Sequence, residues 1–158
     1  MGGDRYEREL VNSLDACGYV AMRAPSSGSA TERELPDVLA MRPVPQVLDV
    51  DGGGIETVGA TEALAIELKT TSSTTAYADE SEVAALEQFA REAGARPLVA
   101  GRFKRTGYDR VHYLVPPERC RRTQGDDAGN YGVPEDDARE RSALVVNATA
   151  ETVEVVEP

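Results

Sequence analysis

One short stretch of the chain places an acid and a base where they could cleave a phosphodiester bond. Within residues 62–71, Glu67 and Lys69 follow an apolar run that is typical of a buried strand. Residues two apart on a strand point to the same face, so these two side chains lie side by side. The carboxylate can hold a divalent cation, while the ammonium steadies a water molecule and the charge that builds on the phosphate. The alternative is an ordinary amphipathic strand with a salt bridge.

Further acids can join this pair from other elements. Asp37 follows Pro36 at the start of another predicted strand. If the two strands are neighbours, Asp37 and Glu67 can reach one cation, and hard divalent cations such as Mg²⁺ prefer carboxylate oxygens. Glu7 lies on the first predicted helix, near the edge of its apolar stripe. These acids and Lys69 form the candidate site.

The elements that position these residues can be predicted from periodicity and from turn residues. Asp4 as N-cap and Gly18 as stop bound a first helix, and Gly94 ends a second. The Gly run at 52–54 precedes no helix, which argues against a phosphate-binding loop. In chain order we predict a helix over 4–17, strands over 19–23 and 37–41, a hairpin over 43–61, a strand over 62–71, a helix over 80–93, strands over 96–103 and 110–115, a helical turn from Pro116 that carries Arg119, Arg121 and Arg122, and a loop over 123–134.

This order predicts an α/β fold in which a central mixed β-sheet is flanked by α-helices. The length of 158 residues suits one domain. We expect that domain to cover residues 1–133, with an acidic C-terminal tail over 134–158 whose pattern is too weak to assign. No apolar run approaches the roughly 20 residues of a membrane span, so we expect no membrane partner.

The chain is strongly acidic. The net charge is -11, from 28 acids and 17 bases, and the lysines are Lys69 and Lys104. An acidic surface that has shed its lysines suggests a halophile with a cytoplasm at very high salt, where screening removes distant repulsion. An acidic protein from an ordinary cytoplasm is the alternative. Cys17 and Cys120 form no metal motif, and we expect them to be reduced thiols in a cytoplasmic protein. We expect the lone His112, in a predicted strand, to be structural.

The candidate residues resemble the Pro-Asp…Glu-x-Lys nuclease superfamily, and flanking stretches narrow the match. Together they resemble archaeal Holliday junction resolvases of the Hjc type over about residues 3–131. The blocks that carry the resemblance keep the family's order along the chain. They are residues 3–10 (Gly-Asp-Arg-Tyr-Glu-Arg-Glu-Leu), 23–29 (Arg-Ala-Pro-Ser-Ser-Gly-Ser), 36–40 (Pro-Asp-Val-Leu-Ala), 66–69 (Ile-Glu-Leu-Lys), 87–94, and 121–123 followed by 129–131.

The resemblance implies a restriction-endonuclease-like nuclease fold and a function: resolution of four-way DNA junctions by paired symmetric cuts. It implies that Asp37 and Glu67 hold Mg²⁺, for which Mn²⁺ can substitute, and that Glu7 is a further ligand or an outer acid. Lys69 would orient the attacking water. Ser27 would help close the site over the DNA, and the phosphates would be contacted by Arg8 and Arg23.

The resemblance also implies a homodimer, because a four-way junction has two-fold symmetry and must be cut on two opposed strands. Phe89 and the strand over 98–103 are candidates for the dimer interface. The chain departs from the family at Gly2, where a lysine is frequent, and at 79–82, which is acidic where the family tends to be basic. Two alternatives stay open: a related nuclease that acts on linear DNA, and a non-catalytic junction-binding module.

Overall fold

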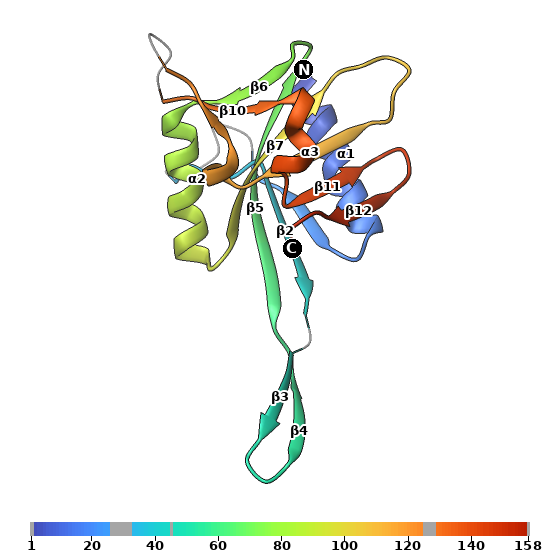
Figure 1. Cartoon of the computed structure of the whole chain (residues 1–158), viewed down its shortest axis with the longest axis vertical. Helices are drawn as coiled ribbons and strands as arrows, with labels where there is room; N and C mark the ends of the chain where they lie inside the picture. Colours follow the sequence, from blue (N-terminus) through green and yellow to red (C-terminus); the bar gives the residue numbers. More distant parts are fainter. Residues whose placement is uncertain (1, 26–32, 45, 125–128, 158) are drawn as a thin grey trace.

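The computed structural model describes residues 2–25, 33–44, 46–124 and 129–157 (Figure 1). In chain order the elements are α1 (Gly2–Ala16), β1 (Val20–Arg23), β2 (Val38–Pro43), β3 (Gln46–Val50), β4 (Gly54–Val58), β5 (Thr61–Thr71), β6 (Thr75–Ala78), α2 (Glu80–Ala93), β7 (Arg96–Phe103), β8 (Val111–Val115), η1 (Pro117–Arg119), β9 (Arg121–Arg122), β10 (Tyr131–Pro134), η3 (Glu135–Asp137), α3 (Ala138–Arg141), β11 (Leu144–Asn147) and β12 (Thr152–Val155). No helix in the described ranges is long and apolar enough to cross a membrane.

The main sheet has seven strands in the order β1-β2-β5-β7-β8-β11-β12. β5 and β7 pair in parallel across the α2 crossover, and the other neighbours pair antiparallel. A parallel pair needs such a crossover, because the chain must return to the starting edge of the sheet. The predicted central mixed sheet flanked by helices is therefore confirmed.

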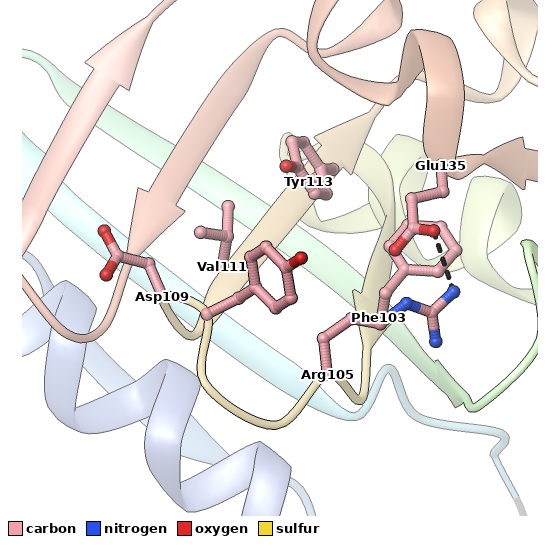
Figure 2. Close-up of a pocket in the computed structure, with 7 residues that line it drawn as sticks. Phe103, Arg105, Asp109, Val111, Tyr113 and Glu135 are labelled. Atoms are coloured by element: carbon pink, nitrogen blue, oxygen red, sulfur yellow. Dashed lines mark hydrogen bonds and ion pairs between the residues drawn. The ribbon is translucent and has the colours of Figure 1, made fainter.

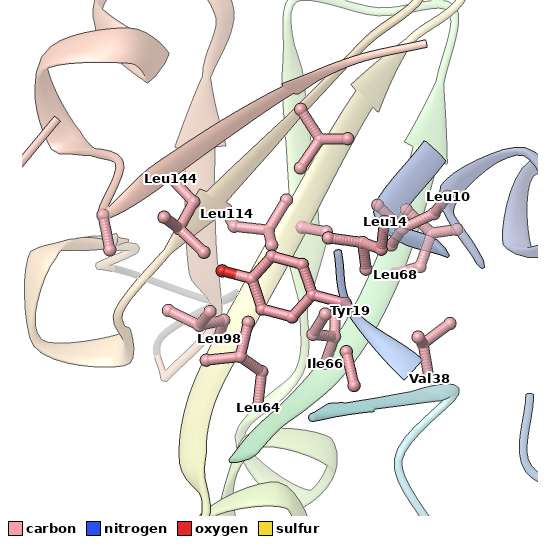
Figure 3. Packing of buried hydrophobic residues seen from close by; sticks show 14 residues of the cluster. Leu10, Leu14, Tyr19, Val38, Leu64, Ile66, Leu68, Leu98, Leu114 and Leu144 are labelled. Carbon is pink, nitrogen blue, oxygen red and sulfur yellow. The ribbon is translucent and has the colours of Figure 1, made fainter. Parts of the chain in front are cut away.

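The two faces of the sheet carry separate cores. Leu10 and Leu14 of α1 pack on one face against Leu64 and Ile66 of β5 (Figure 3). The other face packs against α2, where Val83 is fully buried in the second core. β5 alternates between these cores, so it is covered on both sides and can place a polar pair at a defined depth.

Local sequence signals set the ends of the two long helices. Asp79 and Glu82 form a capping box at the start of α2, and Gly94 ends that helix in the left-handed region with φ 68°. Gly18, with φ 93°, follows α1 as predicted. Asp4 is not the N-cap that the sequence predicted: it lies inside the first turn of α1, where a carboxylate favours the helix dipole.

The hairpin predicted over 43–61 is present as β3 and β4, which pair antiparallel from Gln46↔Val58 to Val50↔Gly54. Gly52 and Gly53 turn it with φ of 102° and 81°. Figure 1 shows the β3–β4 hairpin extending from the end of β2 and the start of β5, away from the helices. It lies far along β5 from the candidate site.

A second sheet, in the order β6-β10-β9, corrects two predictions. Residues 131–134, predicted to be loop, form β10 and pair with β6, which the sequence did not predict. Arg121 and Arg122 lie on β9 and not on the helical turn η1, which carries Arg119. These strands are short, and their pairing depends on partners far apart in the sequence, so local patterns do not reveal them.

The stretch 134–158, which the sequence set apart as an acidic tail, contains ordered elements of the main sheet. β11 pairs with β8 on one side and with β12 on the other. Leu144 and Val146 belong to the core beneath α1. The acids of this stretch lie between or outside these apolar positions. β11 has only four residues, so its apolar pattern was too short to identify it as a strand from the sequence.

Candidate active site

The register of β2 on β5 brings the first two predicted residues together. Val38 pairs with Ile66, so Asp37 stands one position further, beside Glu67. The Asp37 Oδ2 atom accepts a hydrogen bond from the backbone N–H of Leu68 at 2.8 Å. This bond fixes the Asp37 carboxylate against β5, on the side where Glu67 lies.

Lys69 completes the predicted group on the α2 face of β5. Its Nζ atom lies 3.7 Å from Glu67 Oε1. Ile66 and Leu68 point to the opposite face and belong to the core beneath α1. The strand alternation predicted from the sequence therefore holds: apolar residues fill the core, and the acid and the base share the other face.

Burial raises the pKa values of the two carboxylates, Asp37 and Glu67. Burial, together with the negative charge of Asp37, raises the pKa of Glu67 to about 9. Burial also raises the pKa of Asp37, although the Leu68 N–H and Lys69 oppose that rise. Two adjacent, partly buried carboxylates cannot both ionise cheaply, so this pair requires either a proton or a cation. That requirement suits a divalent metal ion.

Asp37 and Glu67 are too few to form a closed metal cage by themselves. Within the described part of the chain, no group of three or more His, Cys, Asp or Glu side chains is arranged to hold a metal ion. Mg²⁺ is commonly held by one or two carboxylates, with water and substrate phosphates at its other positions. Asp37 and Glu67 fit that pattern.

Glu82 is a member of this group that the sequence analysis did not identify as functional. Its carboxylate, presented from the first turn of α2, contacts the Lys69 ammonium directly. A signal was present, since Asp79 and Glu82 have the spacing of a capping box. That signal marks a helix start, however, and cannot show that the acid also reaches a neighbouring strand.

Glu7 lies close to the pair but has its own partner. Its Oε2 atom accepts a hydrogen bond from Arg23 Nε at 3.0 Å, and Arg23 also bonds Asp4 at 2.6 Å. Burial raises the pKa of Glu7, and Asp37 adds to that rise while Arg23 opposes it. Glu7 is therefore in electrostatic contact with Asp37, and Arg23 links it to the start of α1.

The remaining predicted residues differ in placement. Arg8 is exposed on α1 and lines a hollow of about 390 Å³ with Arg5 and Arg110, among others. Glu9 and Glu151 line the same hollow, so its charge is mixed. Ser27 lies outside the described residues.

Comparison with known proteins decides the family. The family profile of the archaeal Holliday junction resolvase (Hjc) matches residues 1–51 and 54–152. The chain belongs to this family. As a member, it is a junction-resolving endonuclease that acts in DNA recombination and repair.

Structural comparison supports the fold. The chain is similar to the Holliday junction resolvase Hjc of Archaeoglobus fulgidus, with 24% sequence identity, a TM-score of 0.61, and coverage of 94% of this chain and 99% of that one. No curated protein sequence matches the chain. The resemblance to Hjc resolvases seen in the sequence is thus confirmed, and with it the restriction-endonuclease-like fold.

A second polar group in this Hjc family member lies on the opposite face of the sheet. Glu9 of α1 accepts hydrogen bonds at 2.7 Å from Arg102 Nε of β7 and from Nε2 of His112 of β8. The His112 side chain is fully buried and its Nδ1 atom has no partner, so Nε2 carries the proton in the neutral ring. His112 is therefore structural, as predicted.

A further hollow of about 360 Å³ lies beyond the end of β7 and is separate from the acidic group. Figure 2 shows Phe103, Tyr113 and Val111 around it, with Arg105 bonded to Glu135 at 2.7 Å. None of the predicted site residues lines it. This hollow is therefore separate from the group formed by Asp37, Glu67 and Lys69.

Proposed function

We propose that this protein cuts four-way DNA junctions by Mg²⁺-dependent hydrolysis at Asp37, Glu67 and Lys69. The proposal rests on the pair of partly buried carboxylates beside an ammonium, in a chain of the Hjc family. Asp37 and Glu67 would hold the cation, and Mn²⁺ could replace Mg²⁺ because both accept carboxylate oxygens. When bound, the cation supplies an activated water and stabilises charge on the phosphate.

The protein's own side chains divide the remaining work. Lys69 orients the attacking water and offsets charge on the phosphate. Glu7 acts as an outer acid, since its carboxylate is already bonded to Arg23 and influences Asp37 through space. Arg8 and Arg23 contact phosphates through planar guanidinium groups. Ser27 helps to close the site over the bound junction.

Two active sites are needed to cut opposed strands, so we propose that the protein acts as a homodimer in the cytoplasm. The strand over 98–103 cannot form the interface that the sequence suggested, because β7 lies between β5 and β8 and Leu98 is fully buried. Phe89 on α2 remains a candidate. It is partly exposed and lines a shallow hollow with Ala85 and Gln88, among others.

Charge-removing variants of the two carboxylates test the site. Asp37→Asn and Glu67→Gln should each lower the cleavage rate of a synthetic four-way junction by at least about 10²-fold, because the charge that holds the cation is lost. Junction binding in a gel-shift assay should stay within about threefold of the unchanged protein, since the phosphate contacts remain.

Glu62→Gln is the matched control. Glu62 lies on the same strand β5, and its carboxylate bonds Arg42 at 2.7 Å, away from the acidic group. This variant should cleave at the normal rate. Undiminished cleavage by Asp37→Asn or Glu67→Gln would remove that residue from the metal site.

A further inference from the structure

The Lys69 ammonium has two acids within reach. It contacts the Glu82 carboxylate directly, while Glu67 Oε1 lies 3.7 Å away. All three side chains are largely shielded, with exposed fractions of 26% for Lys69, 30% for Glu82 and 14% for Glu67. A lysine side chain is long and flexible, so the balance between these two acids decides where its charge sits.

Glu82 is itself held in place by the start of α2. Its Oε1 atom accepts a hydrogen bond from the Asp79 N–H at 3.1 Å, and its own N–H donates to Asp79 Oδ1 at 2.8 Å. The Ser81 hydroxyl adds a third bond to the same Asp79 oxygen at 2.7 Å. One oxygen of Glu82 therefore caps the helix, and the other is presented to Lys69 from a fixed position.

We propose that Glu82 is a positioning residue that holds the Lys69 ammonium off the Asp37–Glu67 pair and so keeps these carboxylates free for a divalent cation. Without the Glu82 charge, the acids that still act on Lys69 are the partly buried Glu67 and Asp37. The ammonium would then act as a resident cation and compete with the metal for them. This inference rests on the proposed role of Asp37 and Glu67 as metal ligands.

Metal binding to the DNA-free protein tests the proposal without relying on activity. In Glu82→Gln the amide oxygen can still cap α2, but the negative charge beside Lys69 is gone. Mn²⁺ titration by calorimetry should show about three- to tenfold weaker binding, the size expected when a partly buried ion pair is lost. Glu80→Gln, an exposed acid in the same helical turn, should bind Mn²⁺ normally.

A double-mutant cycle distinguishes two ways in which Glu82 could strengthen metal binding: by holding Lys69, or by direct electrostatic attraction of the metal ion. Lys69→Met removes the competing ammonium, so it should bind Mn²⁺ at least as tightly as the unchanged protein. Glu82→Gln should then have no further effect in the Lys69→Met background. Equal weakening in both backgrounds, or weaker binding in Lys69→Met alone, would overturn the positioning role. Thermal unfolding of each variant shows that it is folded.

Glu67→Gln, measured in the same way, distinguishes the two proposals. If Glu67→Gln loses Mn²⁺ binding but Glu82→Gln binds normally, the metal site stands and the role of Glu82 is wrong. If Glu67→Gln binds Mn²⁺ normally, the metal site is wrong and the positioning role falls with it. Weakening by both substitutions, with the Glu82 effect dependent on Lys69, supports both.

Discussion

At the scale of single residues, Glu9, Arg102 and His112 form a polar group whose side chains are almost completely buried. Burial alone would raise the pKa of Glu9, but hydrogen bonds from His112 and Arg102 outweigh it and lower the pKa to about 2. Burial lowers the pKa of His112, which the bond to Glu9 opposes only in part. This group joins α1 to β7 and β8 and supports the helix that carries Glu7.

The sign of the Glu9 shift gives a pH prediction. The folded protein binds a proton at Glu9 less readily than the unfolded chain does, so Glu9 stabilises the fold above pH 4.5, its ordinary pKa, and loses this effect as pH falls toward 2. The difference in unfolding free energy between the unchanged protein and Glu9→Gln should therefore shrink by up to about 3 kcal/mol across that range. Urea unfolding of both proteins at several pH values measures it, and a constant difference would contradict the shift.

The residues of the candidate site show which contacts local sequence patterns can predict. The proximity of Asp37, Glu67 and Lys69 could be predicted because strand alternation and a preceding proline are local features, and β2 and β5 proved to be neighbours. Glu82 could not, because its contact with Lys69 depends on how α2 packs over β5. The capping-box spacing marks Glu82 as a helix-cap residue and does not show that its carboxylate also reaches Lys69.

At the scale of elements, the contact between β7 and the small sheet limits which residues fit. A Cβ atom on Gly101 of β7 would lie 2.9 Å from Val133 Cγ1 and 3.1 Å from Val133 Cβ of β10. Such distances are closer than carbon atoms tolerate, so a glycine at this position lets the two sheets approach.

Gly101→Ala should therefore destabilise the fold by about 1–3 kcal/mol through overpacking. Val133→Ala should lower the unfolding free energy less in the Gly101→Ala background than in the unchanged protein. The reason is that the smaller side chain makes room for the new methyl group. Gly59→Ala is the control, since a Cβ there meets nothing within 4 Å. Thermal unfolding checks the four variants, and additive losses in the double variant would argue against this contact.

The elements that the sequence predicted best are those with their own signals. α2 begins at a capping box and ends at a left-handed glycine, and the β3–β4 hairpin turns at Gly52 and Gly53. By contrast, β6, β10 and β11 have four residues each and are fixed by pairing with distant strands. Their apolar positions become meaningful only once a neighbouring strand is in place.

At the scale of the whole molecule, the net charge of -11 opposes both compaction and DNA binding. The arginines that pair with acids, such as Arg23 and Arg102, recover part of this energy locally. The remaining repulsion is long-range, so salt should screen it. The expectation of a high-salt cytoplasm, drawn from the composition, stays a prediction that salt dependence can test.

We predict that the fold is more stable, and junction cleavage faster, in molar KCl than in about 0.1 M KCl, because screening at molar salt acts over about 3 Å. Selectivity for junctions over linear DNA should survive, since non-specific binding is the more purely electrostatic of the two. Thermal unfolding and cleavage across a KCl series measure both effects. If stability and activity both peak at low salt, the high-salt interpretation is wrong, although the resolvase assignment would stand.

We propose that this protein cuts four-way junctions with a divalent cation held by Asp37 and Glu67. The most direct measurement incubates it with a synthetic four-way junction and with a linear duplex of matched sequence, first with MgCl₂ and then with EDTA. We expect paired cuts on opposed strands of the junction with MgCl₂, little cutting of the duplex, and none of either with EDTA. Equal cutting of both DNAs would contradict junction selectivity, and junction cutting that persists in EDTA would contradict a metal-dependent reaction.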